Sequence, residues 1–115
     1  MRTCEAFPQG LAPTHHELDI TNREQVYVYF LDRRPTAVIH CATLTSIRKC
    51  ENDKQKAFEV NVRRTRDLLN ALDSIRDYGY FVYVSTGCVF SGDEDSHFYS
   101  EFDLLYPKNF YWLFA

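Results

Sequence analysis

Two short apolar runs, residues 37–41 and 80–84, constrain the fold of this chain more than any other feature. Both are continuous and rich in β-branched or aromatic residues, so we expect two strands that are buried on both faces. The segment between them is long enough to hold a crossover helix. Because strands joined in this way run parallel, the sequence predicts an α/β fold with a doubly wound parallel sheet.

Helical patterns lie before and between the two predicted strands. Thr21 and Glu24 form a capping-box pattern that predicts a helix start, and this helix should end before Pro35. Asn61 and the charged run at 63–67 flank the apolar stripe of a second, longer helix, and the charged run falls mostly on its solvent side. That stripe consists of Phe58, Val62, Thr65, Leu69 and Leu72.

The other segments are expected to be connections. Residues 1–16 contain two prolines and a glycine and look irregular, and residues 43–53 are predicted to form a polar loop. Residues 85–106 are polar and turn-rich. The tail from Pro107 to the end is expected to begin a further helix, with the proline near its first turn.

Length and charge exclude several classes of protein. A chain of 115 residues allows one domain, and a net charge of -3 gives no footprint for a nucleic-acid partner. The apolar runs are far shorter than the roughly 20 residues that a membrane span needs. The first ten residues do not resemble a signal peptide, so we expect a cytoplasmic protein without a membrane partner.

The cysteines and histidines predict neither disulfides nor a metal site. No Cys-x-x-Cys pair exists, and without a secretory context we expect the four cysteines to be free thiols, mostly buried. His15 and His16 are adjacent and would not share a helix face, while His40 and His97 stand alone.

Small and hydroxyl residues follow both predicted strands, at 41–43 and 85–87. Ligands of doubly wound sheets bind at the carboxyl ends of the strands, where these residues leave room. The Thr86 hydroxyl there and the Tyr111 phenol near the next helix could together hold a carbonyl oxygen, with the phenol donating the proton. The chain has eight tyrosines, however, and a packing role for Tyr111 remains an alternative.

Five segments, in sequence order, resemble motifs of one enzyme family. Residues 84–92 are similar to a strand end with the pattern Ser-Thr-Asp-Tyr-Val-Phe-x-Gly, and residues 107–111 are similar to Pro-x-Asn-x-Tyr. The other matching segments are residues 18–21, residues 38–42, and residues 45–51 together with 60–62. On these motifs the chain resembles the extended short-chain dehydrogenase/reductase family, and in particular its dTDP-4-dehydrorhamnose reductase branch.

The resemblance implies a partial Rossmann-like fold, NADP or NAD as cofactor, and a nucleotide-linked 4-keto sugar as substrate, as in dTDP-rhamnose biosynthesis. Thr86 would polarise the sugar carbonyl and Tyr111 would act as the acid. Asn61 would support the strand ends through backbone hydrogen bonds. The residues implied to contact the cofactor are Asp19, Ile20, Cys41, Ala42, Thr43, Thr45, Asn61 and Ser85.

The chain also departs from the family pattern. It contains no Gly-x-x-Gly-x-x-Gly turn, whose backbone amides normally cradle the cofactor diphosphate. Ala115 stands where the family has a lysine four residues after the tyrosine, and Gly87-Cys88 replaces an Asp-Tyr pair. We therefore expect residues 1–115 to form a single incomplete NAD(P)-binding domain, a fragment that is inactive alone.

Two alternatives stay open at this stage. One is a non-catalytic regulatory subunit resembling the β subunit of methionine adenosyltransferase, which acts by binding a catalytic partner. The other is a nucleotide-sugar epimerase or dehydratase of the same superfamily. A homodimer is compatible with each of these interpretations.

Overall fold

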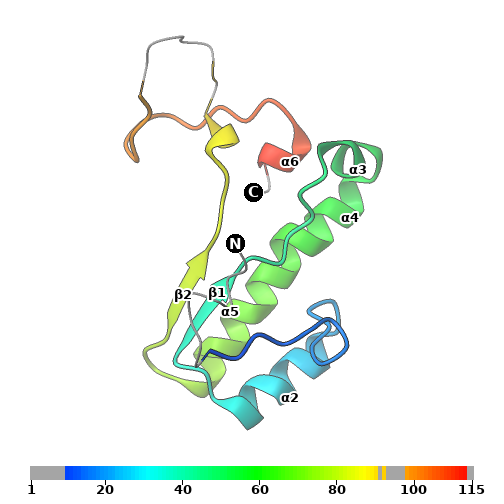
Figure 1. Ribbon diagram of the computed structural model, residues 1–115, viewed down its shortest axis with the longest axis vertical. Coiled ribbons are helices and arrows are strands. Elements are labelled where there is room, and N and C mark those ends of the chain that lie inside the picture. The colour runs from blue at the N-terminus through cyan, green and yellow to red at the C-terminus, as the bar shows by residue number, and fades with distance from the viewer. Residues whose placement is uncertain (1–9, 91, 93–97, 114–115) are drawn as a thin grey trace.

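The computed structural model describes residues 10–90, 92 and 98–113 of the chain (Figure 1). The elements in chain order are α2 (Arg23–Arg33), β1 (Ala37–His40), α3 (Ile47–Asn52), α4 (Lys54–Phe58), the π-helical turn η1 (Glu59–Arg63), α5 (Arg64–Ile75), β2 (Tyr80–Tyr83), the 3₁₀ turn η2 (Gly87–Val89) and α6 (Phe110–Leu113). Strands β1 and β2 pair in parallel, with Ala37 opposite Tyr80 and His40 opposite Tyr83. The predicted parallel α/β arrangement is confirmed.

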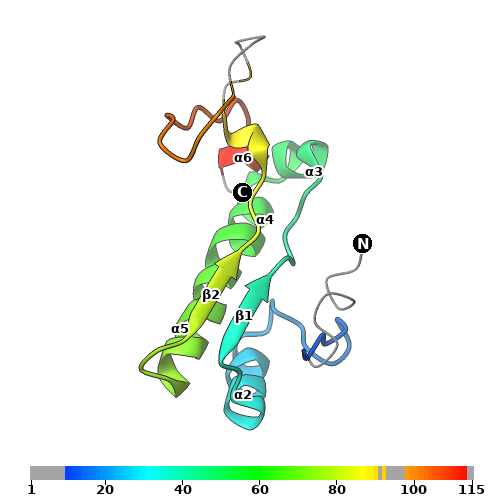
Figure 2. The same ribbon diagram turned by 60° about the vertical axis from the view of Figure 1, so that its left-hand side comes forward.

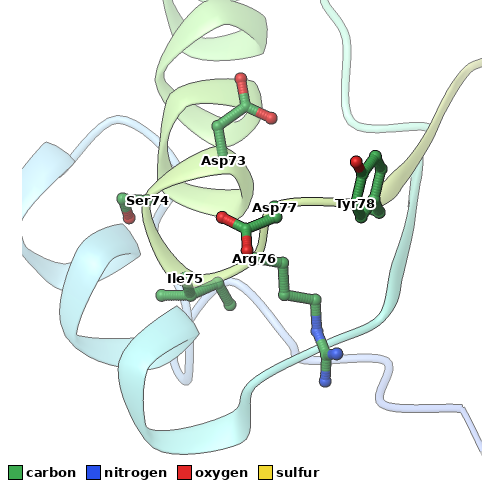
Figure 3. Close-up of a pocket in the computed structure, with 6 residues that line it drawn as sticks. All are labelled: Asp73, Ser74, Ile75, Arg76, Asp77 and Tyr78. Atoms are coloured by element: carbon green, nitrogen blue, oxygen red, sulfur yellow. The ribbon is translucent and has the colours of Figure 1, made fainter.

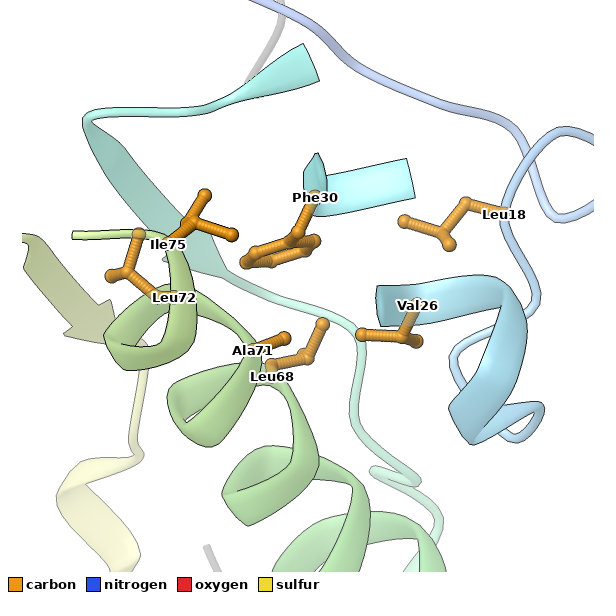
Figure 4. Packing of buried hydrophobic residues seen from close by; sticks show 7 residues of the cluster. All are labelled: Leu18, Val26, Phe30, Leu68, Ala71, Leu72 and Ile75. Atoms are coloured by element: carbon orange, nitrogen blue, oxygen red, sulfur yellow. The ribbon is translucent and has the colours of Figure 1, made fainter. Parts of the chain in front are cut away.

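Helices α2 and α5 lie on the same face of the sheet and form the core with it (Figures 1 and 2). Figure 4 shows side chains of α2 pointing towards α5, with a residue of the preceding loop beside them. The buried cluster consists of Leu18, Val26, Phe30, Leu68, Ala71, Leu72 and Ile75. Val38 of β1 and Phe81 of β2 pack against this cluster from the sheet.

The opposite face of the sheet is exposed, so the prediction of strands buried on both faces is wrong. Ile39 is 38% exposed, Val82 50% and Tyr80 77%. Successive side chains of a strand point to opposite faces, and the helices of the described region cover only one of them. The apolar runs therefore contain one buried and one solvent-facing row.

Helix α2 begins one residue later than the capping-box pattern predicts. Its N-cap is Asn22, whose side chain accepts a hydrogen bond from the backbone N–H of Gln25 at 3.1 Å. Thr21 instead donates two hydrogen bonds to the Asp19 carboxylate. The helix ends as predicted before Pro35, because Arg34 adopts a left-handed conformation with φ of 43°.

The long crossover helix buries a stripe that agrees with the predicted one at Leu72, which is fully buried, but not at Phe58 and Leu69. Phe58 is 37% exposed and Leu69 is 39% exposed, whereas Ala57 and Ala71 are fully buried. Leu68 and Ile75, which the predicted stripe did not include, are buried in the core cluster beside Ala71. Asn61 is 2% exposed and lies within the buried stripe rather than beside it.

One member of the predicted solvent-facing charge run is also buried. Asp67 is 9% exposed, and its carboxylate accepts a hydrogen bond from Arg64 at 2.9 Å and lies 3.9 Å from the Arg23 guanidinium. Arg64 also pairs with Glu59 at 3.1 Å. Asp67 is therefore held between α2 and α5 by two cations, because a buried carboxylate needs such partners.

The segment expected to be a polar loop contains helix α3. The Ser46 hydroxyl caps this helix by accepting from the backbone N–H of Lys49, and Cys50 is buried beneath it. Cys50 is the buried thiol among the described cysteines, while Cys41 and Cys88 are exposed, so the expectation of mostly buried thiols is wrong. Cys4 lies outside the described residues.

Two arginines tie together the ends of α2 and α5, at the bottom of Figure 1. The Arg34 guanidinium donates to the carbonyl of Ile75 at 3.3 Å, and Arg76 donates to the carbonyls of Pro35 and Arg34 at 2.9 and 3.0 Å. These bonds connect the end of α2 with the end of α5. We call this arrangement the arginine clasp.

At the other end, α6 begins at Phe110, which agrees with the helix expected after Pro107. Residues 114–115, including Ala115, lie outside the described part of the chain. No helix among the described residues combines the length and the apolar character that crossing a membrane requires.

Candidate functional site at the carboxyl edge of the sheet

The residues after β1 and β2 leave the same edge of the sheet because the two strands are parallel (Figure 2). The backbone N–H of Val84 donates to the carbonyl of His40 at 3.1 Å, which extends the pairing one residue beyond the strands. Cys41, Ala42 and Ser85 are exposed there, and Thr43 and Thr86 are half-buried. The structure thus gathers these five predicted site residues at one edge.

Asn61 fixes the loop that follows β1. Its carboxamide oxygen accepts from the backbone N–H of Leu44 at 2.7 Å, and its nitrogen donates to the Leu44 carbonyl at 3.2 Å. The thiol of Cys50 donates to the same carbonyl at 3.4 Å. The expected backbone support by Asn61 is therefore present, and it positions Thr43 and Thr45 on either side of Leu44. Contact of Asn61 or Thr45 with a cofactor stays a prediction.

His40 joins this network, a role that the sequence pattern did not indicate. The Thr65 hydroxyl donates to the backbone carbonyl of Asn61 at 2.6 Å, and Nε2 of His40 lies 3.0 Å from the same hydroxyl oxygen. Because the Thr65 proton is used, Nε2 of His40 must be the donor. Burial lowers the pKa of His40, which favours this neutral form. One sequence feature could have pointed to His40, namely its position near the end of a predicted strand and just before small residues.

Thr86 ends the segment after β2 and organises the turn η2. Its hydroxyl oxygen accepts from the backbone N–H of Cys88 at 3.3 Å, and its carbonyl accepts from Val89 at 3.4 Å. Because the Thr86 hydroxyl only accepts in this bond, its O–H group can still donate a hydrogen bond to another partner.

Tyr111 lies on α6, which packs beside η2, α3 and α4 (Figure 1). A hydrogen bond of 2.9 Å from the N–H of Tyr106 to the carbonyl of Val89 brings the chain back to this side. Burial raises the pKa of Tyr83 at the end of β2, and the neighbouring Tyr111 phenol raises it further. Helix α6, which carries Tyr111, therefore lies beside η2, the turn that follows Thr86. A joint contact of the two side chains with one oxygen stays a prediction.

Asp19 and Ile20 lie apart from this pair, just before α2. The Asp19 carboxylate accepts two hydrogen bonds from Thr21, which lower its pKa. Ile20 packs against the hydrophobic core. In the structure both side chains lie at the start of α2, and their contact with the adenosine of a cofactor stays a prediction.

The glycines that the structure places do not form the turn that normally binds the diphosphate of a dinucleotide. A glycine-rich turn would place backbone amides against the diphosphate, but a Cβ on Gly79 would meet Leu72 at 2.7 Å and Gly92 faces open space. Neither glycine forms a cradle. The small residues after the strands leave room for a ligand at this edge.

Two surface hollows of the described residues lie away from the carboxyl edge. One has a volume of 440 Å³ and is lined by residues 73–78, at the turn before β2 (Figure 3). The other, of 580 Å³, lies between residues 11–17 and the outer side of α2. Within the described residues, no three His, Cys, Asp or Glu side chains gather as a metal site would require.

Comparison with known proteins identifies the family. The family model described as "RmlD substrate binding domain" matches residues 5–112. The chain belongs to the RmlD substrate binding domain family. The resemblance to dTDP-4-dehydrorhamnose reductases that was predicted from the motifs is thereby confirmed.

Individual RmlD-family relatives agree with this assignment. A dTDP-4-dehydrorhamnose reductase from Aggregatibacter actinomycetemcomitans is 35% identical over 97 residues, covering 84% of this chain and 32% of the relative. The structure of a dTDP-4-dehydrorhamnose reductase from Bacillus anthracis in complex with NADP has a TM-score of 0.78 at 33% identity, covering 88% of this chain and 35% of that one. The structure of RMD from Pseudomonas aeruginosa complexed with NADPH has a TM-score of 0.77 at 27% identity, covering 90% of this chain and 35% of that one.

These comparisons also confirm the fold class as a partial Rossmann-like α/β domain. The chain spans about a third of the length of the relatives that it matches.

Proposed function

We propose that this chain is the catalytic-edge segment of an NAD(P)H-dependent reductase that acts on a nucleotide-linked 4-keto sugar. The observation that carries the proposal is the family match over residues 5–112, which includes both Thr86 and Tyr111. The adjacency of α6 and η2 supports it, because α6 carries Tyr111 and η2 begins directly after Thr86.

Reduction of a ketone needs a hydride at the carbonyl carbon and a proton at its oxygen. In this proposal the Tyr111 phenol donates the proton, and the Thr86 hydroxyl donates a hydrogen bond to the oxygen as charge develops. Asn61 keeps the loop after β1 in place beside them through its two bonds to Leu44. NADP or NAD would supply the hydride. The described residues do not provide a diphosphate cradle, so we expect no turnover by the chain alone.

A chimera tests the proposal directly. Residues 5–112 replace the matching segment of the Aggregatibacter actinomycetemcomitans reductase, and NADPH oxidation is followed with dTDP-4-dehydrorhamnose. We expect turnover by the chimera and none by the isolated chain. Tyr111→Phe should slow the chimera by about 100-fold or more, because it removes the acid. Thr86→Val should slow it by about 100-fold, because it removes one donor to the oxyanion.

Tyr106→Phe is the matched control. Tyr106 is 68% exposed and lies in the connection just before α6, the helix that carries Tyr111, so its hydroxyl should be dispensable and the rate should stay within about twofold. Equal rates for the Tyr111→Phe chimera and its parent would contradict the proposal.

A second candidate is a non-catalytic regulatory subunit, favoured by Ala115 at the position of the family lysine. In that case the chain would bind the catalytic subunit of a methionine adenosyltransferase. Co-purification of the two proteins, together with a chimera that is folded but inert, would favour this alternative over the reductase.

A further inference from the structure

The segment 41–43, which follows β1, is held at both of its ends. Before it, the backbone carbonyl of His40 accepts from the N–H of Val84 at 3.1 Å and fastens the strand end to β2. After it, the Asn61 carboxamide bonds both polar groups of the Leu44 backbone. Within it, the N–H of the last residue donates to the carbonyl of the first at 3.2 Å, as in a γ-turn.

Side chains also join the two fixed ends of this segment to each other. Nε2 of His40 donates to the Thr65 hydroxyl at 3.0 Å, and that hydroxyl donates to the Asn61 backbone carbonyl at 2.6 Å. The contacts therefore run from His40 along the chain to Leu44, across to Asn61, and back through Thr65 to His40. We call these four residues the closed network.

The polar side chains of the closed network lie deep in the molecule. His40 is 3% exposed, Asn61 is 2% exposed, and Thr65 is half-buried. The rings nearest to His40 are those of Tyr83 and Phe81, with centroids at 5.6 and 6.1 Å. Packing among aromatic rings does not require a polar residue, and burying one costs free energy unless its hydrogen bonds are made. The contact with Thr65 is therefore the feature that a histidine provides here.

The backbone around Asn61 is unusual as well. Asn61 lies in the π-helical turn η1, where the N–H of Arg64 donates to the carbonyl of Glu59, five residues earlier. Such turns are rare and occur frequently at functional sites. The Thr65 hydroxyl holds this turn from the first residues of α5, and the turn directs Asn61 towards Leu44.

We propose that His40 and Thr65 are positioning residues for the nicotinamide dinucleotide. They act through Asn61 and fix the segment 41–43 before the ligand arrives. Ligands of parallel α/β sheets bind at the carboxyl ends of the strands, and the first two residues of this segment are exposed there. A segment that is already fixed loses less conformational entropy on binding, so the ligand binds more tightly. This inference rests on the proposed reductase function, because the dinucleotide is the cofactor of that reaction.

Hydrogen exchange in the 115-residue chain tests the closed network without any ligand. Thr65→Val removes the hydroxyl and keeps the shape of the side chain. The fully buried Val26, whose N–H bonds to the Asn22 carbonyl at 3.1 Å, reports on any general loss of stability. We expect Thr65→Val to raise the ratio of the Leu44 exchange rate to the Val26 exchange rate by about tenfold. Thr65→Ser keeps the hydroxyl and should restore the ratio.

Binding of NADPH to the chimera described above tests the consequence for the ligand. A fluorescence titration measures the Kd, and we expect Thr65→Val and His40→Phe each to raise it by about tenfold. Their kcat should stay within about threefold of the parent, because Thr86 and Tyr111 are unchanged. His40→Gln retains a donor to Thr65, so its Kd should stay within about threefold of the parent.

Ser74→Ala is the matched control. The Ser74 hydroxyl also donates to a backbone carbonyl of α5, that of Ala71 at 2.7 Å, but near the other end of the helix. This variant should change neither the exchange ratio nor the Kd for NADPH. An unchanged ratio in Thr65→Val, equal effects of Thr65→Val and Ser74→Ala, or an unaltered Kd in both Thr65→Val and His40→Phe would each overturn this proposal alone. A folded parent chimera that binds no NADPH would instead overturn the reductase proposal, and this inference with it.

Discussion

A single carboxamide holds the segment between the predicted strand-end residues in place. Asn61 is 2% exposed and bonds both polar groups of the Leu44 backbone. We expect Asn61→Ala to lower the free energy of unfolding by about 2–4 kcal/mol, because it leaves buried backbone groups without partners. Urea unfolding measures this change. Asn70→Ala, an exposed position on α5, should change stability by less than about 0.5 kcal/mol. Equal losses for the two variants would contradict the assigned role.

His40 gives the protein a pH-dependent stability. Burial lowers its folded-state pKa below the ordinary value of 6.5, so between these two values the unfolded chain binds more protons. Stability is therefore complete above pH 6.5 and decreases as the pH falls below it, by at most about 1.4 kcal/mol per pH unit. Urea unfolding at pH 7.5 and pH 5.5 measures the difference.

Two variants isolate the contribution of His40. His40→Gln can still donate to Thr65 but does not titrate, so it should flatten the dependence in this window. His16→Gln, at an exposed position, should leave the dependence unchanged. An unaltered pH dependence in His40→Gln would show that another group is responsible.

Single residues also show how far the site was predictable. Thr86 and the residues at 41–43 were found because small and hydroxyl side chains after a strand indicate a binding edge. Tyr111 was found only through its motif, since the chain has eight tyrosines. His40 was missed because an isolated histidine gives no pattern, and its partner Thr65 lies 25 positions away.

At the scale of the elements, residue patterns located the strands and the helices better than they predicted burial. The strands lie where the apolar runs are, but whether a strand is covered on one face or two depends on what packs against it. Helix α3 was missed because its six residues are too few to show a periodic stripe. The buried face of α5 includes Asp67 and Ala71, which carry little weight in an apolar pattern.

The start of α2 provides a test at this scale. The Asn22 side chain caps the helix at the N–H of Gln25. Asn22→Ala should therefore lower the free energy of unfolding by about 1 kcal/mol, whereas Asn22→Asp should preserve it. Thr21→Ala, at the residue that the sequence pattern indicated, should cost less than Asn22→Ala in the same thermal or urea unfolding experiment. The reverse order would restore Thr21 as the cap.

The whole molecule is elongated, with extents of 48 × 29 × 28 Å, and spans about a third of its relatives' length. Its parallel topology followed from the sequence because a long helix separates the two strands. The exposure of Ile39, Tyr80 and Val82 did not follow, because an apolar strand indicates burial without identifying what covers it.

The arginine clasp fastens one end of the molecule. It joins residues about 40 positions apart, where α2 and α5 finish. Helices α3 and α6 and the turn η2 meet at the opposite end. The clasp therefore holds the two core helices together from the side that a molecule bound near Thr86 and Tyr111 would not touch.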